Sequence, residues 1–139
     1  MKSLLAVFFL YILTGTAFAE TNPLVGRFTH DFTSPKNQSV WTVKRTGNAW
    51  QVLVHGSHQT VRARQIGDAE RAEFWDQMWW PADKSKDAQC LLVEAKLQGM
   101  ICYVQRSTRS GISDLSSRKS DYFYFDSMGG LMEIRRKDT

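Results

Sequence analysis

Apolar side chains recur at every second position in several short segments of this chain, with turn residues between them. The clearest pair is 40–46 and 49–55, both rich in β-branched and aromatic residues, with Gly47-Asn48 between them as a tight-turn signal. A period of two places alternate side chains on one face of a strand, so this pair predicts an antiparallel hairpin. Six further segments predict strands: 26–33, 59–64, 89–95, 100–105, 121–126 and 131–136.

Segment 68–80 has a different period. Asp68 is suited to cap a helix start, Pro81 prevents continuation, and Ala72, Trp75 and Trp79 recur at helical spacing. The segment therefore predicts an amphipathic helix whose Trp75 and Trp79 join the core. Its polar side chains are expected in solvent: Glu70, Arg71, Glu73 and Asp76.

Eight strands and one helix predict a mainly β (α+β) fold. We expect an antiparallel meander sheet or a small eight-stranded β-barrel, with the amphipathic helix packed on it.

Residues 1–19 have the pattern of a cleaved signal peptide. Lys2 gives a positive start, residues 4–13 form an uncharged apolar run, and Ala17-Phe18-Ala19 provides a small-x-small cleavage site. We expect cleavage before Glu20, which leaves 20–139 as a single domain in the periplasm or outside the cell. The alternative is an uncleaved membrane anchor, but the apolar stretch is at the short limit for a bilayer span.

Cys90 and Cys102 are the only cysteines. An exported chain meets an oxidising environment, and antiparallel strands at 89–95 and 100–105 bring the two side chains face to face. We therefore predict a disulfide between them. Free thiols or a metal pair are the alternatives, which neither C-x-x-C spacing nor further ligands nearby support.

The charge balance of the mature chain is modest. Without Lys2, 17 basic and 14 acidic side chains remain, a net charge of +3. This excess alone does not indicate a nucleic acid or a membrane as partner. We expect no nucleic acid partner and, after cleavage, no membrane span.

Catalytic and metal-binding patterns are weak in this sequence. His30, His55 and His58 could in principle bind a metal, but Gly56-Ser57 indicates a turn between the last two. Serines and aspartates are plentiful, yet no nucleophile elbow surrounds any serine. We assign no catalytic residue, no metal site and no cofactor.

A serine-rich segment, 107–120, carries a cluster of cations and is expected to be a long connection without regular structure. Such a segment is either a mobile solvated loop or a contact surface for an acidic patch on a partner. Trp80, beside Pro81 at the expected helix end, could stay partly exposed as an anchor. The predicted partner-binding residues are Arg106, Arg109, Arg118, Lys119 and Trp80.

Two short motifs are similar to motifs of known families. Gly26-Arg27-Phe28 resembles the Gly-x-Trp opening of lipocalins, with Phe in place of Trp. Ser110-Gly111 resembles the Ser-Gly loop of bacterial periplasmic lysozyme inhibitors, without the tyrosine that follows it there. Both families are small barrels, and no family is assigned from either motif.

These features predict a non-enzymatic binding protein. The favoured hypothesis is that the protein engages another exported or envelope protein, as an inhibitor, a toxin-immunity factor or an assembly accessory factor. The alternative is a lipocalin-like carrier that holds a small apolar ligand inside the barrel.

Overall fold

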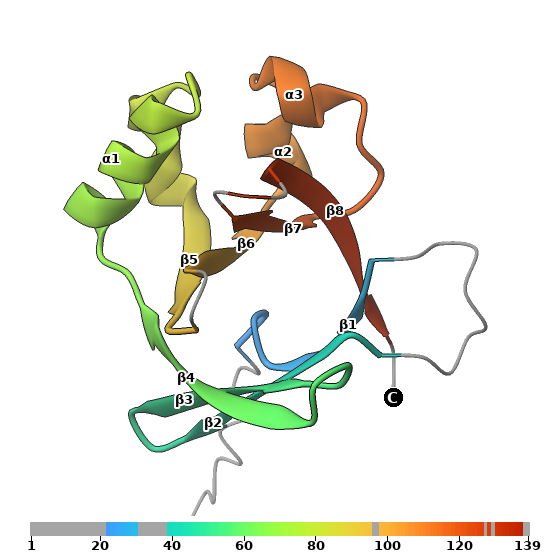
Figure 1. Cartoon of the computed structure of the whole chain (residues 1–139). Helices are drawn as coiled ribbons and strands as arrows, with labels where there is room; N and C mark the ends of the chain where they lie inside the picture. The colour runs from blue at the N-terminus through green and yellow to red at the C-terminus, as the bar shows by residue number, and fades with distance from the viewer. Residues whose placement is uncertain (1–21, 31–38, 96–97, 127, 129, 138–139) are drawn as a thin grey trace, which may run out of the picture.

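Eight antiparallel strands form a closed barrel in the computed structural model, which describes residues 22–30, 39–95, 98–126, 128 and 130–137 (Figure 1). Each strand pairs with the next, and β1 pairs with β8 to close the barrel. This confirms the mainly β fold and selects the barrel over an open sheet. The strands are β1 (Gly26–Thr29), β2 (Trp41–Thr46), β3 (Ala49–Val54), β4 (Gln59–Gln65), β5 (Ala88–Val93), β6 (Gly99–Val104), β7 (Tyr122–Asp126) and β8 (Gly130–Lys137).

The β2–β3 hairpin forms as its sequence predicts. Thr46 pairs with Ala49 across the two-residue turn, and Gly47 has a φ of 60°. This left-handed conformation is accessible to glycine without a steric penalty. Burial alternates along β3 in this register: Trp50 and Val52 are buried, whereas Ala49 and Gln51 are exposed.

The barrel interior is filled by side chains. Trp41 stacks on Tyr124 with 4.7 Å between ring centroids, and Tyr122 contacts Phe28 at 5.2 Å. Gly99 leaves room for this packing, since a Cβ there would lie 2.4 Å from the Tyr124 hydroxyl oxygen. Eight strands enclose a space that side chains can fill. The buried members of this cluster are Leu24, Phe28, Val43, Trp50, Val52, Ala63, Leu91, Val93, Ile101 and Ile134.

A second apolar cluster lies outside the barrel, on the outward face of β5, β6 and β7. Helical segments cover this face and gather on one side of the molecule (Figure 1). Their bounds are α1 (Asp68–Gln77), the 3-10 helix η1 (Ala82–Asp87), α2 (Arg106–Arg109) and α3 (Ser113–Ser116). The buried members of the cluster are Ile66, Trp75, Trp80, Ala88, Cys90, Leu92, Met100, Cys102, Val104, Ile112, Leu115 and Phe123.

The predicted disulfide is confirmed within this outer cluster. Cys90 and Cys102 lie directly opposite each other on β5 and β6, with 4.2 Å between their Cα atoms. Such bonds are typical of proteins from oxidising compartments.

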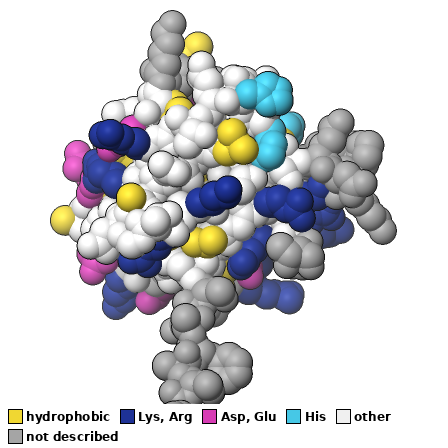
Figure 2. Space-filling model, turned by 90° about the horizontal axis from the view of Figure 1, so that it is seen from below, with side chains coloured by type: hydrophobic (Ala, Val, Ile, Leu, Met, Phe, Trp, Pro, Cys, Tyr) yellow, Lys and Arg dark blue, Asp and Glu magenta, His cyan; other side chains and the backbone are white. Residues whose placement is uncertain are grey.

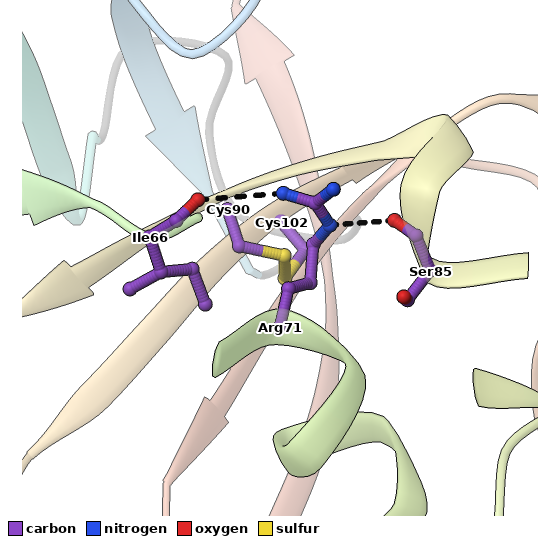
Figure 3. Close-up of a disulfide and its surroundings, with 5 residues drawn as sticks. All are labelled: Ile66, Arg71, Ser85, Cys90 and Cys102. Carbon is purple, nitrogen blue, oxygen red and sulfur yellow. Dashed lines mark hydrogen bonds between the residues drawn. A yellow bond between two sulfur atoms is a disulfide. The ribbon is translucent and has the colours of Figure 1, made fainter. Parts of the chain in front are cut away.

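Arg71 was expected in solvent, and this prediction is wrong: the residue is buried above the disulfide (Figure 3). Its Nε donates to the Ser85 carbonyl at 2.5 Å and its Nη1 to the Ile66 carbonyl at 3.3 Å. Its Nη2 donates to Asp68 at 2.6 Å. The guanidinium thus ties α1 to η1 and to the end of β4, because a planar group with five donors can serve several acceptors at once.

Two further boundaries differ from the sequence prediction. The helix ends at Gln77 rather than at Trp80. The serine-rich segment 107–120 is not a structureless loop, since it contains most of α2 and all of α3. Ile112 and Leu115 anchor this segment in the outer cluster, and these two apolar side chains among many polar ones are what order it.

The predicted signal peptide, 1–19, lies outside the described residues. Within the part of the chain that is described, no helix has both the length and the apolar character that crossing a membrane requires.

We predict that Arg71→Ala lowers the free energy of unfolding by about 2–4 kcal/mol, because it leaves the carbonyls of Ser85 and Ile66 buried without their donor. The matched control is Arg64→Ala. Arg64 pairs with Glu70 at 2.6 Å, but both side chains are substantially exposed, so its removal should cost less than about 1 kcal/mol. Urea denaturation measures both values, and equal effects would contradict the anchoring role of Arg71.

Candidate functional site

A cleft of about 650 Å³ opens beside α2 and α3, and the four cations singled out from the sequence all line it. The cations come from α2 and from the connection between α3 and β7, so two segments separated by α3 meet at one site. The described residues that line the cleft are Arg106, Arg109, Ser110, Ser116, Ser117, Arg118, Lys119 and Asp121.

Arg109 forms the buried base of this cleft, with only 4% of its surface exposed. Its Nη1 donates to the Arg118 carbonyl at 2.5 Å, and its Nη2 pairs with Asp121 at 2.6 Å. Its Nε is also buried and has no hydrogen-bond partner among the described residues. Arg109 is thus buried rather than displayed at the surface, because these bonds fix its guanidinium inward; its contact with a partner stays a prediction.

Three cations remain exposed around the cleft: Arg106, Arg118 and Lys119. Arg118 donates weakly from its Nε to the Asp114 carbonyl at 3.3 Å, and the Lys119 backbone amide donates to Glu133 at 2.9 Å. The first bond holds the Arg118 side chain against α3 and the second fixes the backbone at Lys119. The side chains of Arg106 and Lys119 stay exposed. Since Asp121 already pairs with Arg109, the cleft presents more positive charge than its own carboxylate neutralises.

The serine hydroxyls add neutral hydrogen-bonding groups to this positive site. Ser110 and Ser116 each donate to a backbone carbonyl three residues earlier, at 2.8 Å and 3.0 Å. Their oxygens keep acceptor capacity, while the arginines supply planar donor groups suited to a carboxylate. The arrangement is therefore chemically suited to bind an acidic group.

The side chains that line the cleft are arginine, lysine, serine and aspartate. Among the described residues that line the cleft, none is histidine or cysteine. Nearby, burial raises the pKa of the Tyr103 hydroxyl, and the negative charge of Asp121 raises it further. A phenol with a raised pKa stays protonated at neutral pH, so Tyr103 is not suited to act as a base there.

Trp80 was expected to be partly exposed, and this prediction is also wrong. Only 5% of its surface is exposed, and its ring meets Trp75 edge-on at 5.4 Å between centroids. Its indole Nε1 donates to Asp114 on α3 at 2.9 Å. Trp80 therefore joins α1 to the wall of the cleft from within the core, and we no longer consider it a partner contact.

Trp79 is the exposed tryptophan instead, with 95% of its surface in solvent, although helical spacing placed it in the core. The backbone explains the exchange. The Trp80 amide donates to the Trp75 carbonyl at 2.9 Å, and the Trp79 amide donates to the Asp76 carbonyl at 3.0 Å. This is the Schellman pattern of helix termination, in which the residue before the last donor adopts a left-handed conformation.

Trp79 occupies that left-handed position with a φ of 59°. Glycine is the usual residue there, and a bulky side chain is strained by about 1–2 kcal/mol. The strained turn directs Trp79 into solvent and the next residue, Trp80, into the core. Sequence reasoning missed Trp79 because it continued the helical period through position 79.

The three histidines do not form a metal site. His55 Nε2 lies 2.8 Å from the Thr42 hydroxyl on the neighbouring strand, and His30 contacts the Trp41 ring at 6.2 Å between centroids. Across the described residues, no group of three or more histidine, cysteine, aspartate or glutamate side chains is placed to hold a metal ion.

Comparison of the chain with protein-family models, with curated proteins and with solved structures found no match.

We predict that Trp79→Gly raises the free energy of unfolding by about 0.5–1 kcal/mol, because it relieves the left-handed strain and removes a side chain that buries almost nothing. Trp79→Ala is the matched control. It removes the same ring but keeps the Cβ, so its stability should stay close to that of the parent protein. Thermal denaturation of the three proteins checks both expectations, and a less stable Trp79→Gly would show that the ring contributes to packing.

Proposed function

We propose that this protein binds another exported or envelope protein through its helical side, as an inhibitor, a toxin-immunity factor or an assembly accessory factor. The observation that carries this proposal is the cleft beside α2 and α3, where exposed Arg106, Arg118 and Lys119 surround the ion pair between buried Arg109 and half-buried Asp121. The partner supplies a carboxylate or a small acidic patch. The disulfide supports an extracytoplasmic location for both proteins.

The rigidity of the cleft favours binding over a mobile solvated segment. The apolar side chains of Ile112 and Leu115 are buried beneath it, and the Trp80–Asp114 hydrogen bond ties α3 to the end of α1. A preformed site loses less conformational entropy on association than a flexible loop does. Charges held in place also steer a partner of opposite sign and select its orientation.

Trp79 supplies the apolar contact that such an interface needs. It follows α1, which covers the same side of the barrel as α2 and α3 (Figure 1). Exposed tryptophans contribute strongly to protein interfaces, and this one is presented by the hydrogen-bonded turn that places Trp80 against Trp75. We propose that the cleft orients the partner and that Trp79 inserts into an apolar depression on its surface.

The carrier alternative receives less support from the structure. The interior contains Phe28, Tyr122 and the stacked Trp41–Tyr124 pair, together with many aliphatic side chains. An apolar ligand would have to displace side chains that already bury each other. We therefore do not propose the carrier function.

The test is affinity capture of the tagged protein from its native cells, followed by identification and purification of the captured partner. We expect Arg118→Glu to weaken the measured affinity about tenfold or more and Arg106→Glu/Arg118→Glu to abolish capture, because repulsion replaces attraction for an acidic group. Arg109→Glu is unsuitable, since it would place a carboxylate beside Asp121 in the buried base.

The matched control is Arg45→Glu, which makes the same charge change at an exposed position on β2, away from the helical side. This variant should bind the partner as the parent protein does. An equal loss of affinity in Arg118→Glu and Arg45→Glu would show that binding depends only on the net charge of the protein. Unchanged binding by Arg106→Glu/Arg118→Glu would overturn the role of the cleft.

A further inference from the structure

Charge is segregated between the two sides of the barrel. The only acidic residue of the sequence between positions 21 and 67 is Asp31, which lies outside the described residues. The described carboxylates follow position 67, whereas β1 to β4 carry cations alone. Figure 2 shows the outer face of these strands, with Lys and Arg side chains across it and Asp and Glu side chains toward its margin.

The strand register places these cations on one surface. Lys137 pairs with Arg27, and the same row continues across the sheet through Thr42, Leu53 and Thr60. Residues directly opposite each other point to the same face, so this row is continuous on the outside of the barrel.

A second row lies beside the first. Lys44 pairs with Gln51, and Gln51 pairs with Arg62. Lys44 is two residues after Thr42 on β2, so it shares the outward face with the first row. Five adjacent strands at about 4.8 Å spacing make this cationic face, defined by Arg27, Lys44, Arg62 and Lys137, about 20 Å wide.

The cations of this face repel one another. The pKa of Lys137 is lowered by local desolvation and by the positive charges of Arg27 and Arg135. At the edge of the face, Arg64 has carboxylates of the same chain beside it: it pairs with Glu70 at 2.6 Å and lies 3.9 Å from Glu94. Bound anions would relieve the repulsion, so the interior of the face is the part suited to an external negative charge.

We propose that the cationic face docks the protein on an anionic lipid membrane surface. The cations spread in two dimensions over five strands rather than along a groove, which matches a charged plane better than a linear polymer. The outward residues between them, Thr42, Gln51, Leu53 and Thr60, offer no aromatic ring for base stacking, and the neighbouring His55 imidazole is held at 2.8 Å by the Thr42 hydroxyl. Lipid headgroups need only charge and hydrogen bonds from such a surface.

The geometry lets this contact coexist with protein binding. The cationic face belongs to the strands opposite the helical side that carries the cleft and Trp79 (Figure 1). A molecule docked through β1 to β4 therefore presents its helices away from the membrane. The membrane proposal does not depend on the proposed function, since it uses different residues and a different partner.

The experiment is cosedimentation of the purified protein with vesicles of phosphatidylcholine mixed with phosphatidylglycerol, and with vesicles of phosphatidylcholine alone. We expect binding to the anionic vesicles only, lost as salt is raised. Each surface cation contributes about a fivefold change in affinity. Arg62→Glu should therefore weaken binding at least about fivefold, and Arg27→Glu/Arg62→Glu at least about 25-fold.

The matched control is Lys86→Glu, an identical charge change at an exposed position of η1 on the helical side, which should bind as the parent protein does. Circular dichroism confirms that each variant is folded, and Arg27→Gln/Arg62→Gln replaces the reversed pair if that pair fails to fold. An equal loss of vesicle binding in Arg62→Glu and Lys86→Glu would overturn the cationic face as a docking surface. Absence of vesicle binding, or binding to a soluble sulfated polysaccharide in its place, would overturn the membrane as its partner.

Discussion

Burial of β5 and β6 on both faces is the constraint on which the rest of the structure depends. Leu91 and Ile101 point into the barrel, while Cys90 and Cys102 point outward beneath the helices. A strand that is apolar on both faces is unstable with either face in water. The inward face is buried inside the barrel, so the outward face must be covered by other elements. The helical segments supply that cover, and their placement creates both the cleft and the turn that exposes Trp79.

The opposite side has no such requirement, because β2, β3 and β4 bury only their inward residues. Their outward positions are free to carry charge, and they carry cations. The net charge of the chain, +4, does not reveal this arrangement, since the carboxylates that balance the cations lie mostly on the helical side. The net charge of a chain does not say where its charged side chains lie. The strand register is needed to place them on one surface.

The local part of the fold could be predicted from the sequence, whereas contacts between distant segments could not. Period-two alternation identified all the strands of the barrel, and compartment and pairing identified the disulfide. Closure of the barrel was left open because it depends on β1 meeting β8, which no local pattern records. Four cations of the cleft were found by composition, but composition could not show that Arg109 is buried against Asp121.

The two tryptophan errors at the helix end have a single origin. Helical spacing assigned Trp79 to the core, whereas the expected helix end beside Pro81 left Trp80 partly exposed. The Schellman turn reverses both assignments. Glycine would have signalled that turn, and a tryptophan in its place gave no warning. Arg71 was assigned to solvent because charged residues are seldom buried without partners, and its partners are backbone carbonyls that carry no sequence signature.

Pairing of the first strand with the last also sets the timing of assembly. β1 can find its second neighbour only after Arg135, Arg136 and Lys137 have been synthesised, so the hairpins emerge from the ribosome before the cylinder can be sealed. Until then both β1 and β7 present an unpaired strand edge. Closure of the barrel therefore depends on the strand pairing with the greatest separation in sequence, which is the kind of contact that forms most slowly during folding.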